Sequence, residues 1–169
     1  MSRYLKIIGI VQEFLLEESI ALICIFPAML LLVPELIGPR LITAMYTASL
    51  VGVFFVMSIR PLADLLPNVK WIRPLVILRK GFGVFSASII VSFMVAKIID
   101  LGVSAYFLQY VDPAYWSLEG FKFFAHLGDV TAVPLLLTSN NLSKQLLGKN
   151  WKRLEQLAYV YFYSGAIYE

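Results

Sequence analysis

Residues 81–99, "GFGVFSASIIVSFMVAKII", decide the class of fold, because only one charged side chain, Lys97, interrupts this apolar run. A helix needs about 20 mostly apolar residues to cross the hydrocarbon layer of a bilayer. The run therefore predicts a membrane-spanning helix. The glycines at its start, in "KGFGVF", lack the spacing of a dinucleotide-binding loop and favour close packing against another helix.

The composition of the whole chain is typical of an integral membrane protein. Of its 169 residues, 60% are apolar and 15% are charged, and the mean hydropathy is +0.80. A soluble domain carries roughly a quarter of its residues as charged ones. The net charge of +3 is modest and most basic residues cluster in loops, which argues against a nucleic-acid partner. Cys24 is the only cysteine and His126 the only histidine, which excludes an internal disulfide and a cysteine-based metal site.

The apolar segments predict an all-α, polytopic helix bundle with five transmembrane helices. Residues 19–169 form this domain, with spans at about 19–36, 41–59, 81–99, 123–139 and 154–168. Residues 1–18 form an amphipathic segment that either lies in the membrane interface or lengthens the first span. The last span is short, which leaves open a sixth helix beyond Glu169.

Smaller features refine this arrangement. Pro27 is expected to kink the first span rather than end it. The aromatic stretch at residues 103–116 is too short to span and suits the interfacial belt, where Tyr and Trp settle. The loops at residues 60–80 and 140–153 are rich in Lys and Arg, so the positive-inside rule places both in the cytoplasm. Five spans satisfy this rule with the N-terminus inside.

Four ionisable residues in or beside the predicted spans are candidates for chemistry: Lys97, His126, Asp129 and Glu155. Charges in a bilayer are costly, so each of them needs an explanation. Lys97 either extends to the headgroups or has a function. His126 and Asp129 share a helix face, either as a wetted interfacial pair or as a proton-conducting, quinone-contacting or haem-ligating pair. Glu155 is expected in the first turn of the last helix, where the helix dipole favours a carboxylate. No hydrolytic triad, acid–base carboxylate pair or metal-binding spacing occurs in the sequence.

Two stretches together resemble the ferric-reductase-like transmembrane domain family. Residues 57–84 are similar to a family loop that ends in Leu-Arg-Arg-x-Leu-Gly, a motif found here as residues 78–83, "LRKGFG". Residues 133–160 are similar to a later loop of the form Leu-Gly-x-x-Trp-x-x-Leu-His-x-Leu-x-Tyr. The residues that match it are Thr138, Ser139, Leu147, Gly148, Trp151, Leu154, Leu157 and Tyr159. The resemblance covers about residues 40–169 and is closest to the small bacterial haem-binding subunits that serve a periplasmic methionine-sulfoxide reductase.

The resemblance implies a bacterial inner-membrane protein that holds b-type haem between helices and passes electrons from a cytoplasmic donor. Histidines ligate the haem in the family. The matching positions are Glu155, then Tyr168 or Glu169, and on the earlier helix Ser92 or Phe93. None of these is histidine, and low-spin haem iron is usually held by imidazole, thiolate, thioether or phenolate groups. No cofactor is therefore expected, with haem b as the alternative that the family implies.

Three hypotheses for the function follow. The chain is a haem-free relative of the family that acts as a scaffold, a regulator or the partner of another membrane or redox subunit. Alternatively, it is an electron-transfer subunit that handles haem or quinone through unusual ligands such as His126 or Tyr168. As a third alternative, it is a small transporter or proton-handling protein that uses Lys97, Asp129 and His126. Because the chain has no soluble domain, any nucleotide or flavin must be carried by another chain.

Overall fold

The chain folds as a bundle of helices, and the part of it that the structure describes contains no strand. The computed structural model describes residues 2–33, 38–119, 122–139 and 141–168. In chain order the elements are α1 (Ser2–Leu32), α2 (Pro39–Leu65), α3 (Ile72–Leu75), α4 (Leu78–Leu101), α5 (Val103–Gln109), the 3-10 helix η2 (Pro113–Trp116), α6 (Lys122–Leu137), α7 (Asn141–Leu147), α8 (Lys149–Glu155) and α9 (Leu157–Tyr168). The all-α class predicted from the sequence is confirmed.

Three helical stretches of the described chain are long and apolar enough to cross a membrane. They are Arg3–Leu32, Pro39–Leu65 and Ile72–Leu101, and the third combines α3 with α4. Helices α6 and α9 have 16 and 12 residues. At 1.5 Å per residue these reach about 24 Å and about 18 Å, less than the thickness of the hydrocarbon layer. The five predicted spans therefore divide into three full-length helices and two short ones, which is compatible with an integral membrane protein.

Helix α1 joins two segments that the sequence left separate. It is continuous from Ser2 to Leu32, so the described part of the amphipathic segment 1–18 belongs to the same helix as the first predicted span. Both segments therefore lie within one helical stretch, Arg3–Leu32, that is long and apolar enough to cross a membrane. Pro27 lies inside α1 and does not end it, as predicted. The predicted end of this span at residue 36 lies outside the described residues.

Helix α4 occupies the centre of the bundle and contacts α1, α2 and α6. Glycine permits its close approach to α1, because a Cβ at Gly81 would lie 3.1 Å from Leu15 Cδ1. The Gly81 backbone N–H donates a hydrogen bond to Gln12 Oε1 at 3.1 Å. On the other side, a Cβ at Gly52 of α2 would collide with Ser86 Oγ. The predicted role of the "KGFGVF" glycines in helix packing is confirmed at Gly81.

Four helices meet in one apolar core, to which each contributes a buried side chain. Val53 comes from α2, Ile90 from α4, Ala132 from α6 and Tyr161 from α9. This junction holds the short helices α6 and α9 against the two long ones. It also lies between the two hollow regions of the protein described below.

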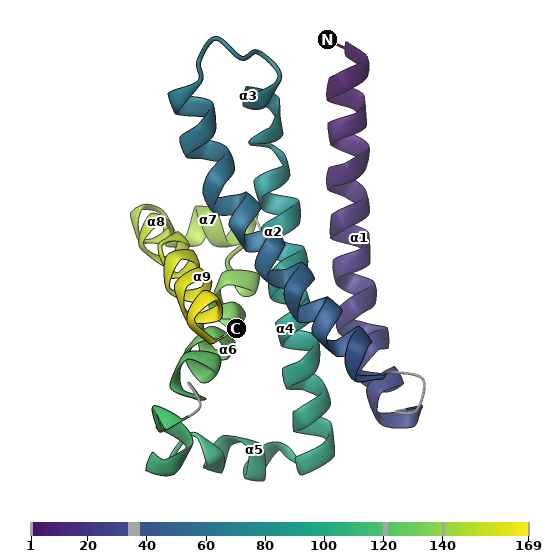
Figure 1. Cartoon of the computed structure of the whole chain (residues 1–169), viewed down its shortest axis with the longest axis vertical. Coiled ribbons are helices and arrows are strands. Elements are labelled where there is room, and N and C mark those ends of the chain that lie inside the picture. The colour runs from purple at the N-terminus through teal and green to yellow at the C-terminus, as the bar shows by residue number, and fades with distance from the viewer. Residues whose placement is uncertain (1, 34–37, 120–121, 140, 169) are drawn as a thin grey trace.

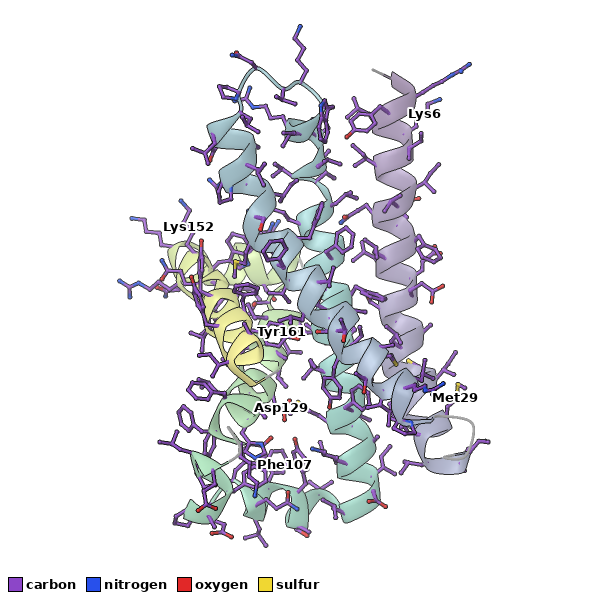
Figure 2. The ribbon with its side chains drawn as sticks, viewed as in Figure 1. Lys6, Met29, Phe107, Asp129, Lys152 and Tyr161 are labelled. Atoms are coloured by element: carbon purple, nitrogen blue, oxygen red, sulfur yellow. The ribbon has the colours of Figure 1, made fainter. Side chains whose placement is uncertain are left out.

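The two ends of the bundle carry different parts of the chain. The N-terminus and the connection from α2 to α3 lie at one end, whereas α5 crosses the opposite end (Figure 1). Lys6 lies close to the first end and Phe107 at the other (Figure 2). Lys152, on α8, is nearer to the first end than Asp129 is (Figure 2). The basic residues of α8 therefore lie on the same half of the molecule as the basic N-terminus.

Candidate functional site

A large polar cavity opens between α2, α4, α6 and α9 on the α5 side of the core. Its volume is about 950 Å³. Tyr46 and Ser49 of α2 form one wall, and Phe162 and Gly165 of α9 form another. Besides its tyrosines, six ionisable side chains line it: Lys97, Asp100, Asp112, Lys122, His126 and Asp129. So many ionisable groups between apolar helices make this polar cavity the main candidate site.

His126 and Asp129 lie one helical turn apart on α6 and face the polar cavity. Their side chains are 12% and 21% exposed, and His126 Nδ1 lies 4.0 Å from Asp129 Oδ2. This distance suits an ion pair but is too long for a hydrogen bond. His126 Nδ1 is buried and has no hydrogen-bond partner among the described residues. A buried polar atom without a partner beside a roomy polar cavity is well placed to bind water or a small solute.

Aromatic residues from the segment after α4 cover His126 on the side of α5. The Tyr115 ring stacks on the imidazole with 3.6 Å between centroids and an angle of 15° between planes. The Trp116 ring meets the imidazole edge-on at 6.1 Å, and its Nε1–H donates to the Tyr110 carbonyl at 2.9 Å. Burial raises the pKa of Tyr115 to about 12, so its phenol stays neutral at physiological pH. The aromatic stretch at residues 103–116 therefore forms a cap over the polar cavity.

The sequence predicted part of this site. His126 and Asp129 share a face of α6, as their spacing predicted. Lys97 is solvent-exposed on α4 and lines the same polar cavity. The three residues that the sequence singled out for proton handling or transport are thus brought together by two different helices.

Tyr161 and Ser49 form the floor of the polar cavity, and the sequence did not single out either of them. The Tyr161 hydroxyl lies 2.7 Å from Ser49 Oγ. Ser49 Oγ also lies 3.0 Å from the Ser86 carbonyl and donates a hydrogen bond to it, which leaves the tyrosine hydroxyl to donate to Ser49. This chain of bonds connects α9, α2 and α4. No sequence signal could have identified the pair, because 112 positions separate its members.

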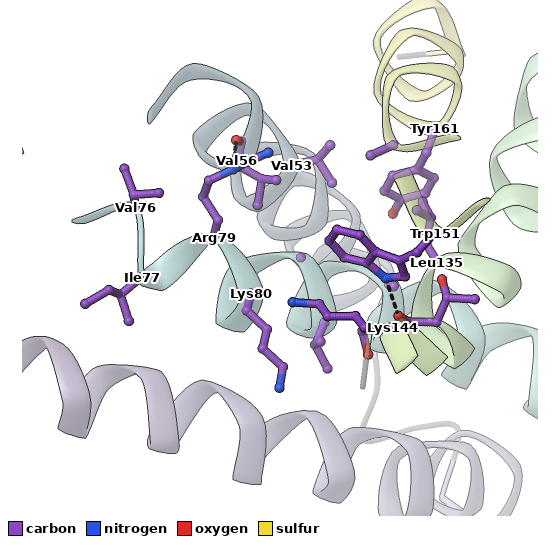
Figure 3. A pocket seen from close by; sticks show the side chains of 16 residues that line it. Val53, Val56, Val76, Ile77, Arg79, Lys80, Leu135, Lys144, Trp151 and Tyr161 are labelled. Carbon is purple, nitrogen blue, oxygen red and sulfur yellow. Dashed lines mark hydrogen bonds between the residues drawn. The ribbon is translucent and has the colours of Figure 1, made fainter. Parts of the chain in front are cut away.

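A second hollow lies on the other side of this floor, toward α3 and α8. This basic pocket has a volume of about 270 Å³. Arg79, Lys80, Lys144 and Trp151 lie around it, as Figure 3 shows. Val53 and Tyr161 line both the basic pocket and the polar cavity. Side chains of the four-helix core therefore separate the two hollows.

On α4, the described positions that the ferric-reductase resemblance matches to haem ligands do not fit haem iron. Phe93 stacks on Tyr46 at 4.7 Å between ring centroids and meets Phe26 edge-on at 5.2 Å. Its hydrocarbon ring offers no atom that could ligate iron. His126 could supply one imidazole, but the chain has no second histidine. The other haem-ligand position on α4, Ser92, donates its hydroxyl to the Ile89 carbonyl at 2.6 Å.

The remaining haem-ligand positions fall at helix ends. Glu155 is the last residue of α8 and Tyr168 the last of α9; their side chains and residue 169 lie outside the described part of the chain. The sequence predicted Glu155 in the first turn of the last helix. This prediction is wrong, because the last helix, α9, begins at Leu157. A turn at Gln156 separates α8 from α9. The Gln156 N–H donates a hydrogen bond to the Arg153 carbonyl, three residues back, at 3.2 Å. The two positions thus do not share one regular helix.

The described side chains include no group of three or more His, Cys, Asp or Glu residues placed to hold a metal ion. Residues with potential for proton exchange gather instead in the polar cavity. Comparison with known proteins adds no relative: no protein-family model, curated protein or solved structure matches the chain.

Proposed function

We propose that this chain is a multi-pass membrane protein that handles protons through the polar cavity. The observation that carries the proposal is the pair of His126 and Asp129, both facing that cavity, with the buried His126 Nδ1 unpaired among the described residues. Ionisable residues inside membrane proteins commonly mark ion pathways and proton relays. Histidine suits such a role because its unperturbed charge changes between pH 5 and 8.

The arrangement suggests a route for the proton. Water in the polar cavity would deliver it to Asp129 or His126, which are close enough to share it through a small rotation or one water. Beyond them, Tyr161 lines both this cavity and the basic pocket, and its hydroxyl pairs with Ser49. Hydroxyl groups both donate and accept hydrogen bonds, so this pair could relay a proton once Ser49 turns its hydroxyl from the Ser86 carbonyl toward water.

For the topology, we propose an N-terminus inside and five crossings, of which α6 and the α8–α9 pair are the short ones. The N-terminus and the basic α2–α3 connection share one end of the bundle (Figure 1), which supports the positive-inside assignment. The acidic residues Asp100 and Asp112 lie near α5 at the other end. A bacterial inner membrane remains the location that the ferric-reductase resemblance implies.

Proton flux into proteoliposomes tests the proposal. Vesicles containing a pH-sensitive dye receive a potassium diffusion potential, and the wild-type protein should acidify or alkalinise the lumen faster than protein-free vesicles do. Asp129→Asn should slow this flux by roughly a hundredfold, the lower end of what a positioned proton-transfer group contributes. Asp64→Asn is the matched control, because Asp64 is exposed on α2 and does not line the polar cavity. Wild-type flux equal to that of empty vesicles, or unchanged flux in Asp129→Asn, would contradict the proposal.

A second candidate function is that of a haem-free ferric-reductase-like scaffold that serves another membrane or redox subunit. The observation favouring it is that both stretches carrying the resemblance meet at the basic pocket. Arg79 and Lys80 come from the first stretch, and Thr138, Ser139 and Trp151 come from the second. The Trp151 indole N–H donates to the Thr138 carbonyl at 3.0 Å, which holds the second stretch together.

An absorption spectrum with a pyridine haemochrome assay distinguishes this scaffold from an electron-transfer subunit. The scaffold should show no b-type haem band after purification in detergent from haem-supplemented cells. A band at near-stoichiometric occupancy would overturn it in favour of electron transfer. His126→Ala would then show whether the single histidine is the ligand: the band disappears if it is, and persists if Tyr168 holds the iron.

A further inference from the structure

The basic pocket combines two kinds of lining that usually occur apart. Arg79, Lys80 and Lys144 supply positive charge at its edge. The remaining wall is largely aliphatic and includes Val53, Val84 and Leu135. No Asp or Glu occurs among the described residues that line it. A ligand that satisfies both parts must carry a negative group and an apolar body.

Two of the three cationic groups, Arg79 and Lys144, are held in place by contacts with the protein. Arg79 Nε donates to the Val56 carbonyl at 3.0 Å, which anchors the guanidinium on α2. Lys144 Nζ lies 4.5 Å from the centroid of the Trp151 ring, a cation–π distance. Figure 3 shows Lys144 beside Trp151, extending toward the start of α4, where Arg79 and Lys80 lie. Cations fixed in this way lose little further freedom when an anion binds.

The size and position of the basic pocket narrow the choice of ligand. A volume of about 270 Å³ is slightly below the usual range for small-molecule sites, so it admits a headgroup and the start of a chain rather than a whole lipid. The pocket lies between the start of α4 and the end of α6, on the half of the molecule that carries the basic loops. Basic pockets between transmembrane helices on this side of a membrane are known to bind anionic headgroups.

We propose that the basic pocket binds the phosphate headgroup of an anionic phospholipid from the leaflet next to the basic loops. The phosphate contacts Lys80 and Lys144, with Arg79 behind them, and the upper acyl chain lies against the valines. A free phosphate ion could make the same contacts with the cationic side chains. Of the two, only a lipid also places an acyl chain against the apolar wall. This site is separate from the polar cavity and does not depend on proton handling.

Native mass spectrometry of protein taken from mixed micelles tests the assignment. Wild-type protein should retain phosphatidylglycerol in preference to phosphatidylcholine. Lys80→Gln and Lys144→Gln should each lower retention of phosphatidylglycerol by about fivefold, and the double variant by about thirtyfold, because each cation near an anionic headgroup contributes a similar factor. Lys70→Gln and Lys152→Gln are matched controls: both residues are exposed and lie outside the pocket lining, so retention should not change.

A second measurement uses only the wild-type protein and therefore does not depend on the folding of any variant. Phosphatidylglycerol should raise the thermal unfolding temperature in detergent more than phosphatidylcholine does, and inorganic phosphate should not abolish the difference. Equal effects of the two lipids would overturn the proposal, as would unchanged retention in the double variant. Displacement of the lipid effect by millimolar inorganic phosphate would also overturn it, because it would identify a site for a free anion.

Discussion

Replacing Gly52 by alanine tests the closest approach between α2 and α4. The added Cβ would collide with Ser86 Oγ, whose side chain is fully buried. Ser86 Oγ has no hydrogen-bond partner among the described residues, so it can move without breaking a bond. The cost is therefore that of a displaced rotamer and local overpacking, about 1–2 kcal/mol of unfolding free energy. Gly83→Ala is the reference on the same helix pair, because its Cβ would meet only Val56 Cγ2 at 3.8 Å.

The comparison with Gly83→Ala matters because alanine improves helix propensity at both positions by up to about 1 kcal/mol. Subtracting the unfolding free energy of one variant from that of the other removes this shared gain and leaves the steric cost at Gly52. The assay is equilibrium unfolding in mixed micelles of dodecyl maltoside and dodecyl sulfate, monitored by far-ultraviolet circular dichroism. Gly52→Ala should be less stable than Gly83→Ala by about 1–2 kcal/mol.

A double variant provides the decisive control for this reasoning. In Gly52→Ala/Ser86→Ala the offending Oγ is absent, and the new Cβ would lie 3.6 Å from the Cβ of residue 86, an ordinary contact. The double variant should recover most of the lost stability. If Gly52→Ala is as stable as Gly83→Ala, or if removal of the Ser86 hydroxyl restores nothing, then α2 and α4 do not meet at this point.

Two further predictions concern hydroxyl groups. Tyr161→Phe should lower the unfolding free energy by about 0.5–1.5 kcal/mol, because it removes a buried hydrogen bond to Ser49. A double-mutant cycle with Ser49→Ala should give a coupling energy of about 0.6 kcal/mol. A coupling energy of zero would contradict this hydrogen bond. Tyr115 should destabilise the protein progressively above pH 10. Its pKa of about 12 when folded exceeds the ordinary value of 10, so between these pH values the unfolded chain binds fewer protons. Unfolding measured from pH 9 to 12 should show a shallower loss of stability for Tyr115→Phe, and identical slopes would argue against burial of this phenol.

Features that depend on local sequence were predictable from it. Long apolar runs predicted α1, α2 and α4, because a spanning helix must satisfy its backbone within one continuous segment. The spacing of His126 and Asp129 placed them on one face, because α-helical geometry fixes that relation. Close packing at Gly81 was predictable as a type of contact, whereas its partners Gln12 and Leu15 were not.

Features that depend on how distant helices pair could not be read from the chain. The bond between Ser49 and Tyr161, like the collision point of Gly52 with Ser86, exists only once α2, α4 and α9 are arranged. No residue type in the sequence signals the break between α8 and α9, since Gln156 is an ordinary helix-forming residue. The position of the cap over His126 was also not predicted. It depends on a turn after α5, where the Asp112 carboxylate accepts a hydrogen bond from the Ala114 N–H at 2.9 Å.

The shared wall of the two hollows also has an electrical consequence. In the proposed topology, water in the polar cavity and around the headgroup in the basic pocket would carry the solution potential inward from each end of the bundle. The voltage across the membrane would then fall mainly over the layer around Tyr161 and Val53, which line both hollows. Moving one elementary charge through 100 mV involves about 2.3 kcal/mol. A proton crossing this layer would experience most of the potential difference over the thickness of a few side chains. The membrane voltage would therefore act on proton transfer at this layer rather than along the full length of the helices.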